Sequence, residues 1–391
     1  MKVSITSEYR FTAMPDGTVW TETAFPYSYW ERYLDHFDEV RIIARLKEAT
    51  QISSGWKRVD GPRVSILGLP DYQGPLGFLK ARFEIRKRMK SVLQNQSAII
   101  LSVPSPIALI AEKIIRKNNL AYGVEMMGDP WEVFSSSGIK HPLRVYFRHS
   151  LTRTTKRIVY GAASVSYVTQ KTLQKRYPSS PNSFSIGVSN IDLLPAHLSI
   201  TPRSFIHLHE IHLISVGSLE QLYKNPEVVL NAVSGCLKNG LKVKLTWIGG
   251  GKYLPELVAL SKSLGLADHV QFLGQVPSGE LIRKYLDEAN LFVLASKTEG
   301  LPRALIEAMA RGLPCIGSDV GGIPELLDPS ELFPPNSPIA LQKKIEEVAR
   351  SAEFLGLMSE RNLLKSKAFL KNNLDQKRSE FLVHLKNSIP A

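Results

Sequence analysis

The sequence predicts an α/β protein with two doubly wound, Rossmann-like domains. Short β-rich runs alternate with longer amphipathic stretches along the whole chain, which is typical of βα units that build parallel sheets. The length of 391 residues suits two domains better than a single hydrophobic core. Hydrophobic residues make up 43% and charged residues 22%, so the composition is that of an ordinary globular protein.

The first series of strands predicts a domain over residues 1–200. Its strands are expected at residues 3–6, 39–44, 64–68, 98–103, 122–126 and 164–168. After Tyr177 the chain passes through the proline- and serine-rich run 178–183 and a further irregular segment with Pro195 and Pro202. Such composition is typical of a linker.

The second series of strands predicts a domain over residues 201–365. Its strands are expected at residues 213–216, 242–248, 270–273, 291–295 and 315–318. Residues 340–387 are helical by pattern, and we expect the last part, 366–391, to form a helix that packs back toward the first domain.

The cysteines and the N-terminus indicate a cytoplasmic protein. Cys236 and Cys315 have no metal-type spacing, so we expect buried thiols in a reducing compartment. The chain begins directly with a strand and lacks the order of a signal peptide. Two prolines and Glu112 interrupt the most apolar window, residues 97–115, which excludes a spanning helix there. Peripheral attachment to the inner face of the membrane is the alternative.

The formal charge of +13 implies an anionic partner or surface. Residues 1–200 hold 27 basic and 16 acidic residues, whereas the remainder is nearly balanced. Much of the excess lies in 78–93, which predicts an amphipathic basic helix. This helix either faces the core with a solvated basic side or docks on an anionic membrane. No recognition motif accompanies the basic run, so we expect no nucleic-acid partner.

The most informative stretch is residues 296–314, SKTEGLPRALIEAMARGLP, which follows an apolar strand. The chain is expected to turn at Glu299 and Gly300, to start a helix at Pro302 and to end that helix at Gly312. A helix that starts beyond the carboxyl end of a parallel strand offers free N–H groups and a positive dipole end, so it favours a diphosphate.

Glu299 and Glu307 are the acidic residues of this stretch. Two carboxylates would repel a phosphate unless each has its own partner. Ionised carboxylates accept hydrogen bonds and cannot donate them, so hydroxyl groups are the expected partners. A sugar on one side and a ribose on the other would satisfy both.

Residues 299–307 resemble the Glu, seven residues, Glu motif of family 4 (group 1) retaining glycosyltransferases, and the similarity continues through residues 316–326, IGSDVGGIPEL. The resemblance implies the GT-B fold, in which two Rossmann-like domains face each other across a cleft. It places the donor sugar at Glu299 and the ribose at Glu307. The alternative is two solvated glutamates on an ordinary helix.

Residues 215–226, SVGSLEQLYKNP, resemble the family segment in which an arginine and a lysine neutralise the donor phosphates. The lysine role falls on Lys224, with a surface lysine as the alternative. Ser218, after Gly217, occupies the arginine position and the loop is longer by one residue, so this chain departs from the family in its charge at the diphosphate.

Further donor contacts follow from the same resemblance. Residues 243–251, with Gly249, are similar to the family's glycine turn, and residues 270–276, ending at Val276, to the stretch that lines the base pocket. Simple strand-to-turn geometry is the alternative for both. Many family members have glycine where this chain has Pro302, and proline cannot donate a hydrogen bond. The N–H groups of Gly300, Leu301 or Arg303 are therefore expected to contact the phosphates.

The acceptor is expected at the carboxyl ends of the first domain's strands. Asp129 and Trp131 follow one such strand, and the family often has His or Asp near this position, so Asp129 is a candidate catalytic residue; an Asx turn before proline is the alternative. Asp16 and Gly17, in the expected first βα loop, are acceptor-side candidates, although the family's paired glycines are missing there.

The sequence thus predicts retaining transfer from a nucleotide-diphosphate sugar to a saccharide or lipid-linked acceptor. No aspartates are spaced as Asp-x-Asp, so we expect no metal, and the nucleotide sugar is a substrate, leaving no cofactor. Positive side chains and helix N–H groups would stabilise the leaving diphosphate. A nucleotide-sugar epimerase or a non-catalytic binding protein remains an alternative. An NAD-dependent oxidoreductase is not expected, because the Gly-x-Gly-x-x-Gly fingerprint of dinucleotide-binding domains would need its third glycine where this chain has Leu254.

Overall fold

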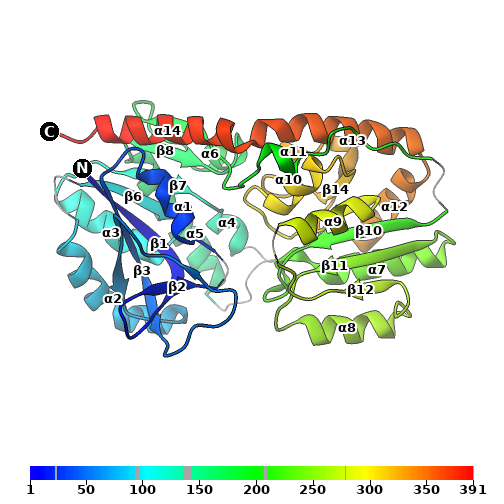
Figure 1. Cartoon of the computed structure of the whole chain (residues 1–391), viewed down its shortest axis with the longest axis horizontal. Helices are drawn as coiled ribbons and strands as arrows, with labels where there is room; N and C mark the ends of the chain where they lie inside the picture. The colour runs from blue at the N-terminus through cyan, green and yellow to red at the C-terminus, as the bar shows by residue number, and fades with distance from the viewer. Residues whose placement is uncertain (23, 94–96, 135–142, 207–208, 278, 391) are drawn as a thin grey trace. The chain divides into compact units, whose positions relative to one another are not determined.

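The computed structural model describes residues 1–22, 24–93, 97–134, 143–206, 209–277 and 279–390. Contacts divide the chain into two compact units (Figure 1). Unit 1 comprises Met1–Pro130, His149–Val188 and Gln376–Ala391, and unit 2 comprises Trp131–Arg148 and Ser189–Asp375. The domain boundaries predicted at residues 200 and 365 stay predictions.

Unit 1 is built on a sheet of nine strands within the described ranges. Seven strands run parallel in the order β5-β3-β1-β6-β7-β8-β9. β2 pairs antiparallel with the C-terminal end of β1, and β4 pairs antiparallel with β2. The bounds are β1 Lys2–Ala13, β2 Val19–Thr21, β3 Glu39–Glu48, β4 Lys57–Arg58, β5 Val64–Leu69, β6 Ala98–Val103, β7 Gly123–Met126, β8 Ser164–Tyr167 and β9 Phe184–Gly187.

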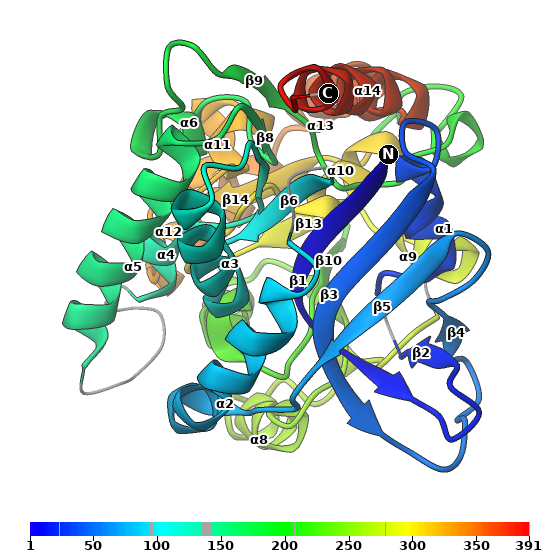
Figure 2. The same cartoon turned by 90° about the vertical axis from the view of Figure 1, so that its left-hand side faces the viewer.

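Helices cover both faces of this sheet, as the predicted doubly wound pattern requires (Figure 2). One side carries α2, α3 and α5, and the other carries α1 and α14. The bounds are α1 Tyr27–Trp30, η1 Glu31–Tyr33, α2 Gly74–Lys90, α3 Pro106–Lys117, α4 Pro130–Val133, α5 Arg144–Tyr160, α6 Thr172–Arg176 and α14 Lys371–Asn387. The residues Trp131–Val133 of α4, the part of α5 before His149 and the part of α14 before Gln376 belong to unit 2.

The expected first βα loop is wrong, because β1 continues to Ala13 and the chain then turns into antiparallel β2. Gly17 adopts a φ of +82° in this turn, which suits glycine. Asp16 Oδ1 accepts hydrogen bonds from the Thr18 backbone N–H at 2.9 Å and from its hydroxyl at 2.7 Å. Asp16 and Gly17 therefore form a β-hairpin turn.

Unit 2 is built on a parallel sheet in the order β12-β11-β10-β13-β14-β15. The strands are β10 Ile211–Val216, β11 Val243–Ile248, β12 Val270–Phe272, β13 Leu291–Leu294, β14 Cys315–Ser318 and β15 Leu332–Phe333. The helices are α7 Pro226–Lys238, α8 Leu254–Ser263, α9 Glu280–Glu288, α10 Arg303–Ala310, α11 Ile323–Leu326, α12 Pro338–Ala349 and α13 Ala352–Ser366, and the 3₁₀ turns are η2 Pro195–His197, η3 Leu222–Lys224, η4 Pro329–Glu331 and η5 Lys367–Phe369.

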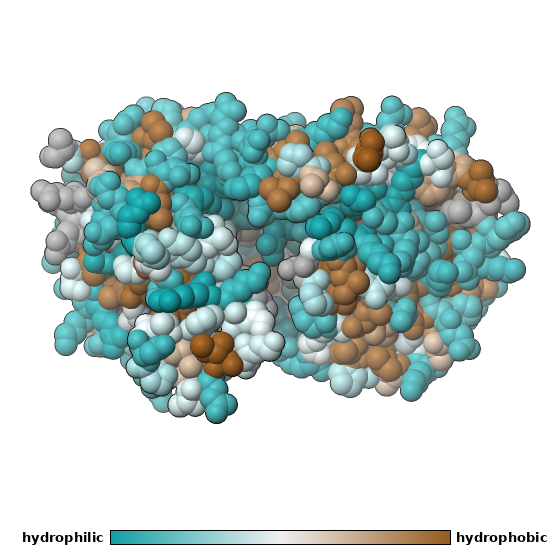
Figure 3. Space-filling model, viewed as in Figure 1, coloured by the Kyte–Doolittle hydropathy of each residue, from teal (hydrophilic) through white to brown (hydrophobic). Residues whose placement is uncertain are grey.

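Four short strands, β2, β4, β9 and β15, lie outside the sequence prediction; each spans two to four residues. β9 lies in the segment predicted as a linker, where it completes the edge of the unit 1 sheet. Cys236 in α7 and Cys315 in β14 are buried, as expected. In the view of Figure 3, apolar side chains on the surface of each unit are scattered among hydrophilic ones. None of the helices in the described ranges is long and apolar enough to cross a bilayer.

The last helix, α14, supplies apolar side chains to the core of unit 1. Phe381, Leu382 and Leu385 are buried against β-strand residues of that core. Ser164 Oγ in β8 donates a hydrogen bond to the Phe381 carbonyl at 3.1 Å. Gly123 in β7 leaves room for the ring, because a Cβ there would lie 3.1 Å from Phe381 Cζ. Residues Gln376–Ala391 thus complete the fold of unit 1.

Replacing Phe381 with alanine is expected to lower the free energy of unfolding of unit 1 by about 3–5 kcal/mol, because the ring is fully buried and leaves a cavity. Urea denaturation measures the loss. Val383→Ala on the same helix is the control, since Val383 is 42% exposed and should change stability by no more than about 0.5 kcal/mol. Equal losses in the two variants would contradict this packing.

Candidate functional site

The sheet of unit 2 has a topological switch point between β10 and β13. From β10 the chain order runs outward through β11 and β12, whereas β13, β14 and β15 follow on the other side. Loops at the carboxyl ends of two such strands diverge and leave a crevice that binds ligands in open α/β sheets. β10 leads into the loop that contains Gly217 and Lys224, and β13 leads into the turn that contains Glu299. The switch point therefore brings both predicted segments to one edge.

Lys224 and Glu299 form a buried ion pair at this edge. Lys224 Nζ donates to Glu299 Oε1 at 2.5 Å, and the two side chains are only 10% and 9% exposed. Ser296 Oγ donates to the same carboxylate oxygen at 2.6 Å. Within the described ranges, Glu299 Oε2 makes no side-chain hydrogen bond. One oxygen thus fixes the carboxylate, and the other remains able to accept a ligand hydroxyl.

Close backbone approaches at glycines bring the loops together. The aliphatic chain of Lys224 crosses Gly217, where a Cβ would lie 2.9 Å from Lys224 Cγ. Gly249, with φ of +137°, lies beside the Gly217 carbonyl, and Gly321, with φ of +54°, lies beside the Glu299 carbonyl; a Cβ at either would be 2.0 Å from that oxygen. A larger residue at any of these positions would displace the Lys224–Glu299 pair.

Helix α10 points its first turn toward the same edge. The helix starts at Arg303, so the predicted start at Pro302 is wrong by one residue: Pro302 is the N-cap, with an extended ψ of 111°. No side chain caps this end. The first N–H groups of an α-helix have no partner within it, so they are available to an anion. Gly312, with φ of +60°, ends the helix region as predicted.

Glu307 is half-buried, one turn after Arg303 in α10. Burial raises the pKa of Glu307, while the positive charges of Arg303 and Arg283 act in the opposite direction. The carboxylate is therefore held in a poorly solvated place where a hydroxyl group would be a favourable partner.

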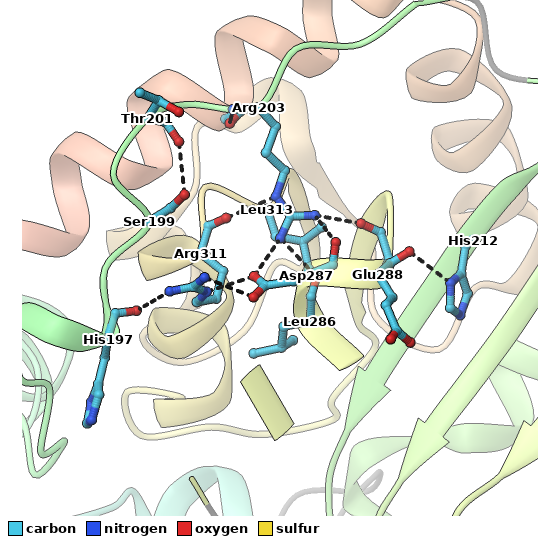
Figure 4. Close-up of polar contacts among 12 residues, drawn as sticks. His197, Ser199, Thr201, Arg203, His212, Leu286, Asp287, Glu288, Arg311 and Leu313 are labelled. Atoms are coloured by element: carbon cyan, nitrogen blue, oxygen red, sulfur yellow. Dashed lines mark hydrogen bonds and ion pairs between the residues drawn. The ribbon is translucent and has the colours of Figure 1, made fainter. Parts of the chain in front are cut away.

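Two arginines fix the far ends of α9 and α10 (Figure 4). Arg203 donates to the carbonyls of Leu286 at 2.9 Å, Ala289 at 2.6 Å and Arg311 at 2.9 Å. Arg311 in turn forms a bidentate pair with Asp287 at 2.7 and 2.8 Å. The guanidinium of Arg203 thereby satisfies carbonyls that both helices leave without helical partners, which holds α10 in position.

The other residues predicted to contact the donor are Ser218, Gly300, Leu301 and Val276. Ser218 is exposed, and its Oγ accepts a hydrogen bond from the Glu220 N–H at 3.2 Å. Gly300 accepts a hydrogen bond from the Gly322 N–H at 2.8 Å. Val276 and Leu301 are both 9% exposed, so each presents little side-chain surface.

Each acceptor-side candidate has contacts of its own. Asp129 is buried, and it accepts a hydrogen bond from the Tyr177 hydroxyl at 2.6 Å and pairs with Arg176. In unit 2, the Arg148 guanidinium lies 3.7 Å from the centre of the Trp131 ring, and its Nε donates to the Trp131 carbonyl at 2.9 Å. Asp16 is exposed at the hairpin turn. The sequence pattern predicts that Asp129 follows the end of a strand, but it does not predict the contacts of Asp129 with Tyr177 and Arg176.

Two residues that position the site were missed as functional candidates. Ser296 binds the Glu299 carboxylate, and Gly321 permits the approach of the chain after β14. Their signals were present, because Ser296 lies three residues before Glu299 and Gly321 begins a glycine pair shortly after the buried strand β14.

Comparison with known proteins agrees with this geometry. The family model of glycosyl transferases group 1 matches residues 201–363. Protein CapJ of Staphylococcus aureus is 24% identical over 93% of this chain and 91% of its own length. The amylovoran biosynthesis glycosyltransferase AmsK of Erwinia amylovora is 34% identical over 37% of this chain and 36% of its own. The family match thus falls within unit 2.

The fold of this chain is also that of solved structures. The structure of Anabaena HepE in complex with UDP-glucose aligns with a TM-score of 0.65 at 14% identity, covering 98% of this chain and 99% of HepE. The predicted GT-B fold class is therefore confirmed.

Removing Lys224 is expected to destabilise unit 2, because Glu299 would keep a buried charge without its partner. Lys224→Met should cost about 3–5 kcal/mol, and Lys224→Met combined with Glu299→Gln should cost less than Lys224→Met alone. Urea denaturation of the three proteins measures both. A loss below about 1 kcal/mol for Lys224→Met, the range of exposed pairs, would contradict the burial of this pair.

The hypothesis that Glu307 binds a ribose predicts that the affinity for UDP falls as the pH decreases from about 8 to about 5, since an ionised carboxylate accepts stronger hydroxyl hydrogen bonds than a protonated carboxyl. Because burial raises its pKa, protonation begins at a higher pH than for an exposed glutamate. Isothermal titration calorimetry across this range gives the profile. Glu307→Gln should weaken UDP binding at pH 8, and its affinity for UDP should fall less between pH 8 and pH 5 than that of the wild type. If the affinity of the variant depends on pH as that of the wild type does, Glu307 does not contact UDP.

Proposed function

We propose that the protein transfers a sugar from a UDP- or GDP-type nucleotide sugar to a saccharide or lipid-linked saccharide, with retention of the anomeric configuration. The observation that carries the proposal is the Lys224–Glu299 pair beside the uncapped first turn of α10, at the switch point of the unit 2 sheet. HepE, which shares the fold, is described in complex with UDP-glucose, which supports a nucleotide-sugar donor.

In this proposal the donor contacts are divided among three groups. The diphosphate is bound by Lys224 and by backbone N–H groups at Gly300, Leu301 and Arg303, where the dipole of α10 favours an anion. Glu299 Oε2 accepts a hydrogen bond from a donor sugar hydroxyl. Glu307 accepts hydrogen bonds from the ribose.

The same groups provide the chemistry of transfer. The C–O bond between the anomeric carbon and the diphosphate breaks, and the acceptor hydroxyl forms the new bond on the same face of the sugar. A leaving phosphate oxygen accepts the hydroxyl proton. Lys224 and the α10 N–H groups stabilise the negative charge that develops on the diphosphate, so the proposal requires no metal. Ser218 contributes no charge here, which places more of this stabilisation on Lys224 and α10.

The acceptor is proposed from weaker observations. AmsK is named for the biosynthesis of amylovoran, which supports a role in polysaccharide or glycolipid biosynthesis. Asp129, bound by Tyr177 and Arg176, would fix the chain after β7 rather than exchange protons with an acceptor. Trp131, Asp16 and Gly17 stay proposed acceptor-side residues.

The decisive experiment is a thermal-shift screen with nucleoside diphosphates and their sugars, followed by transfer assays on saccharide and lipid-linked acceptors. A ligand that binds only the folded protein raises its melting temperature. Transfer with an α-linked donor should give an α-linked product by NMR. Conversion of the donor without acceptor would instead indicate an epimerase, and binding without conversion would indicate a non-catalytic protein.

Glu299→Gln is expected to lower kcat/KM for transfer roughly 100-fold, because a neutral amide is a weaker acceptor for the sugar hydroxyl than a carboxylate. Initial rates at varied donor concentration measure the effect. Glu353→Gln, at an exposed position in α13, is the control and should leave the rate unchanged. Full turnover by Glu299→Gln would remove Glu299 from the mechanism.

We also propose that α2 docks on an anionic membrane surface. Ile85 and Met89 face the core, but Leu76 and Phe83 are 76% and 70% exposed, and Leu79 is half-exposed. These three apolar side chains recur at helical spacing among six basic residues and one acidic residue. The helix therefore has a core-facing side and an exposed apolar stripe, and docking on a membrane stays a prediction. Such a surface suits insertion between anionic lipid headgroups.

Leu79→Ser combined with Phe83→Ser is expected to weaken binding to phosphatidylglycerol vesicles roughly 10- to 100-fold at low salt, because each exposed apolar side chain loses its transfer into the bilayer. Co-sedimentation measures the bound fraction. Ile206→Ser replaces an apolar residue that is 84% exposed in unit 2 and should change nothing. Wild-type protein that stays in the supernatant would refute docking by α2.

A further inference from the structure

Most of the excess positive charge of the protein lies on three neighbouring helices, α2, α3 and the part of α5 in unit 1, together with Arg144 and Arg148 at the start of α5. α2 carries six basic residues and one acidic residue, α3 three and one, and α5 five and none, so they account for +12 of the formal +13. Figure 2 shows the three helices beside one another on one side of the sheet. A surface with one sign of charge raises the local concentration of anions.

A cavity of 590 Å³ lies within this region, between the C-terminal ends of α3 and α5. It is large enough for a small organic ligand. Its walls are apolar side chains, including Ile115, Leu120 and Pro178, together with the ring of Tyr122. The Tyr122 hydroxyl donates to the Ile158 carbonyl at 2.8 Å, so its polar atom is already satisfied by the protein.

Three cations line the cavity around one buried acid. Arg157 binds the Glu112 carboxylate through Nε at 3.2 Å and Nη2 at 3.0 Å, and Arg116 Nε lies 3.3 Å from the same group. Glu112 is buried, whereas the Arg116 and Arg157 side chains remain 68% and 48% exposed. Lys156 forms no ion pair with any residue in the described ranges. One carboxylate thus leaves a surplus of two positive charges.

The dipoles of the two helices explain only part of this arrangement. Basic residues are favourable in the last turn of a helix, where carbonyls lack partners. At the end of α3, however, the Leu120 N–H already donates to the Ile115 carbonyl at 3.1 Å, and the Asn118 N–H to the Ile114 carbonyl at 3.1 Å. The cations therefore exceed what these carbonyls need, and they remain able to bind an external anion.

The cavity is separate from the edge at which unit 1 is expected to bind an acceptor. Tyr122 directly precedes β7, and Gly161 lies shortly before β8, so the cavity lies at the amino ends of these parallel strands. Asp129 follows the carboxyl end of β7. The two ends of a strand are opposite edges of the sheet, so this is a second place in unit 1.

We propose that this cavity binds a phosphate ester with an apolar or ring-bearing substituent. Arg116, Arg157 and Lys156 bind the phosphate, since guanidinium and ammonium groups are the usual phosphate donors in proteins. The apolar walls and the Tyr122 ring contact the substituent. The phosphate comes either from a lipid headgroup or from a soluble metabolite, and the inference does not depend on the proposed transferase activity.

The test uses the full chain and calorimetric titration at low salt with three probes: dihexanoyl phosphatidic acid, 1-naphthyl phosphate and inorganic phosphate. Arg116→Ala combined with Lys156→Ala removes two exposed cations and retains the Arg157–Glu112 pair, so the helices stay joined. Lys113→Ala combined with Lys117→Ala is the matched control, because both lysines are exposed on α3 but do not line the cavity.

The Arg116 and Lys156 double variant is expected to bind the two organic phosphates roughly 10- to 100-fold more weakly than wild type, since it loses two charge-assisted contacts. The Lys113 and Lys117 variant loses the same net charge but no side chain that lines the cavity, so it should bind within about twofold of wild type. Preference for the lipid phosphate would assign a headgroup site, and equal binding of the naphthyl ester a metabolite site. Equal weakening in both variants, or no binding to wild type, would overturn the proposal.

Discussion

The structure of the candidate site depends on a buried ion pair. Removing Lys224 and Glu299 from water is unfavourable, and the pair offsets this cost only because its geometry is close and Ser296 adds a further hydrogen bond. The two residues come from loops that follow β10 and β13, so the pair joins the two halves of the unit 2 sheet at the switch point. It therefore holds both loops in one arrangement.

The other features at this edge of the unit 2 sheet follow from the same constraint. Gly217 and Gly321 are required because larger residues would collide with Lys224 or with the Glu299 carbonyl. Helix α10 then starts directly after Glu299, with Arg203 and Arg311 fixing its other end. Its free N–H groups lie near a cation and a carboxylate that are already paired with each other. Such preorganisation limits the reorganisation that donor binding requires.

Charge has a different distribution in the two units. In unit 2, opposite charges are paired at the site, and Ser218 adds no cation to it. Most of the excess positive charge lies on α2, α3 and α5. The positive charge of this protein is therefore concentrated outside the candidate site.

The sequence by itself determined the α/β class, the main strands and the functional roles proposed for Glu299, Glu307 and Lys224, because apolar runs, turns and a motif with fixed spacing are local properties. Helix boundaries were predicted to within a few residues, and Pro302 was misplaced by one since a proline suits both the N-cap and the first turn. Only the tertiary structure decided that Asp16 and Gly17 form a hairpin, that Asp129 is bound by Tyr177, and that Ser296 holds Glu299. These contacts join side chains to strands and loops whose positions depend on how the sheets assemble. The residue pattern of one strand does not specify which segments pack beside it.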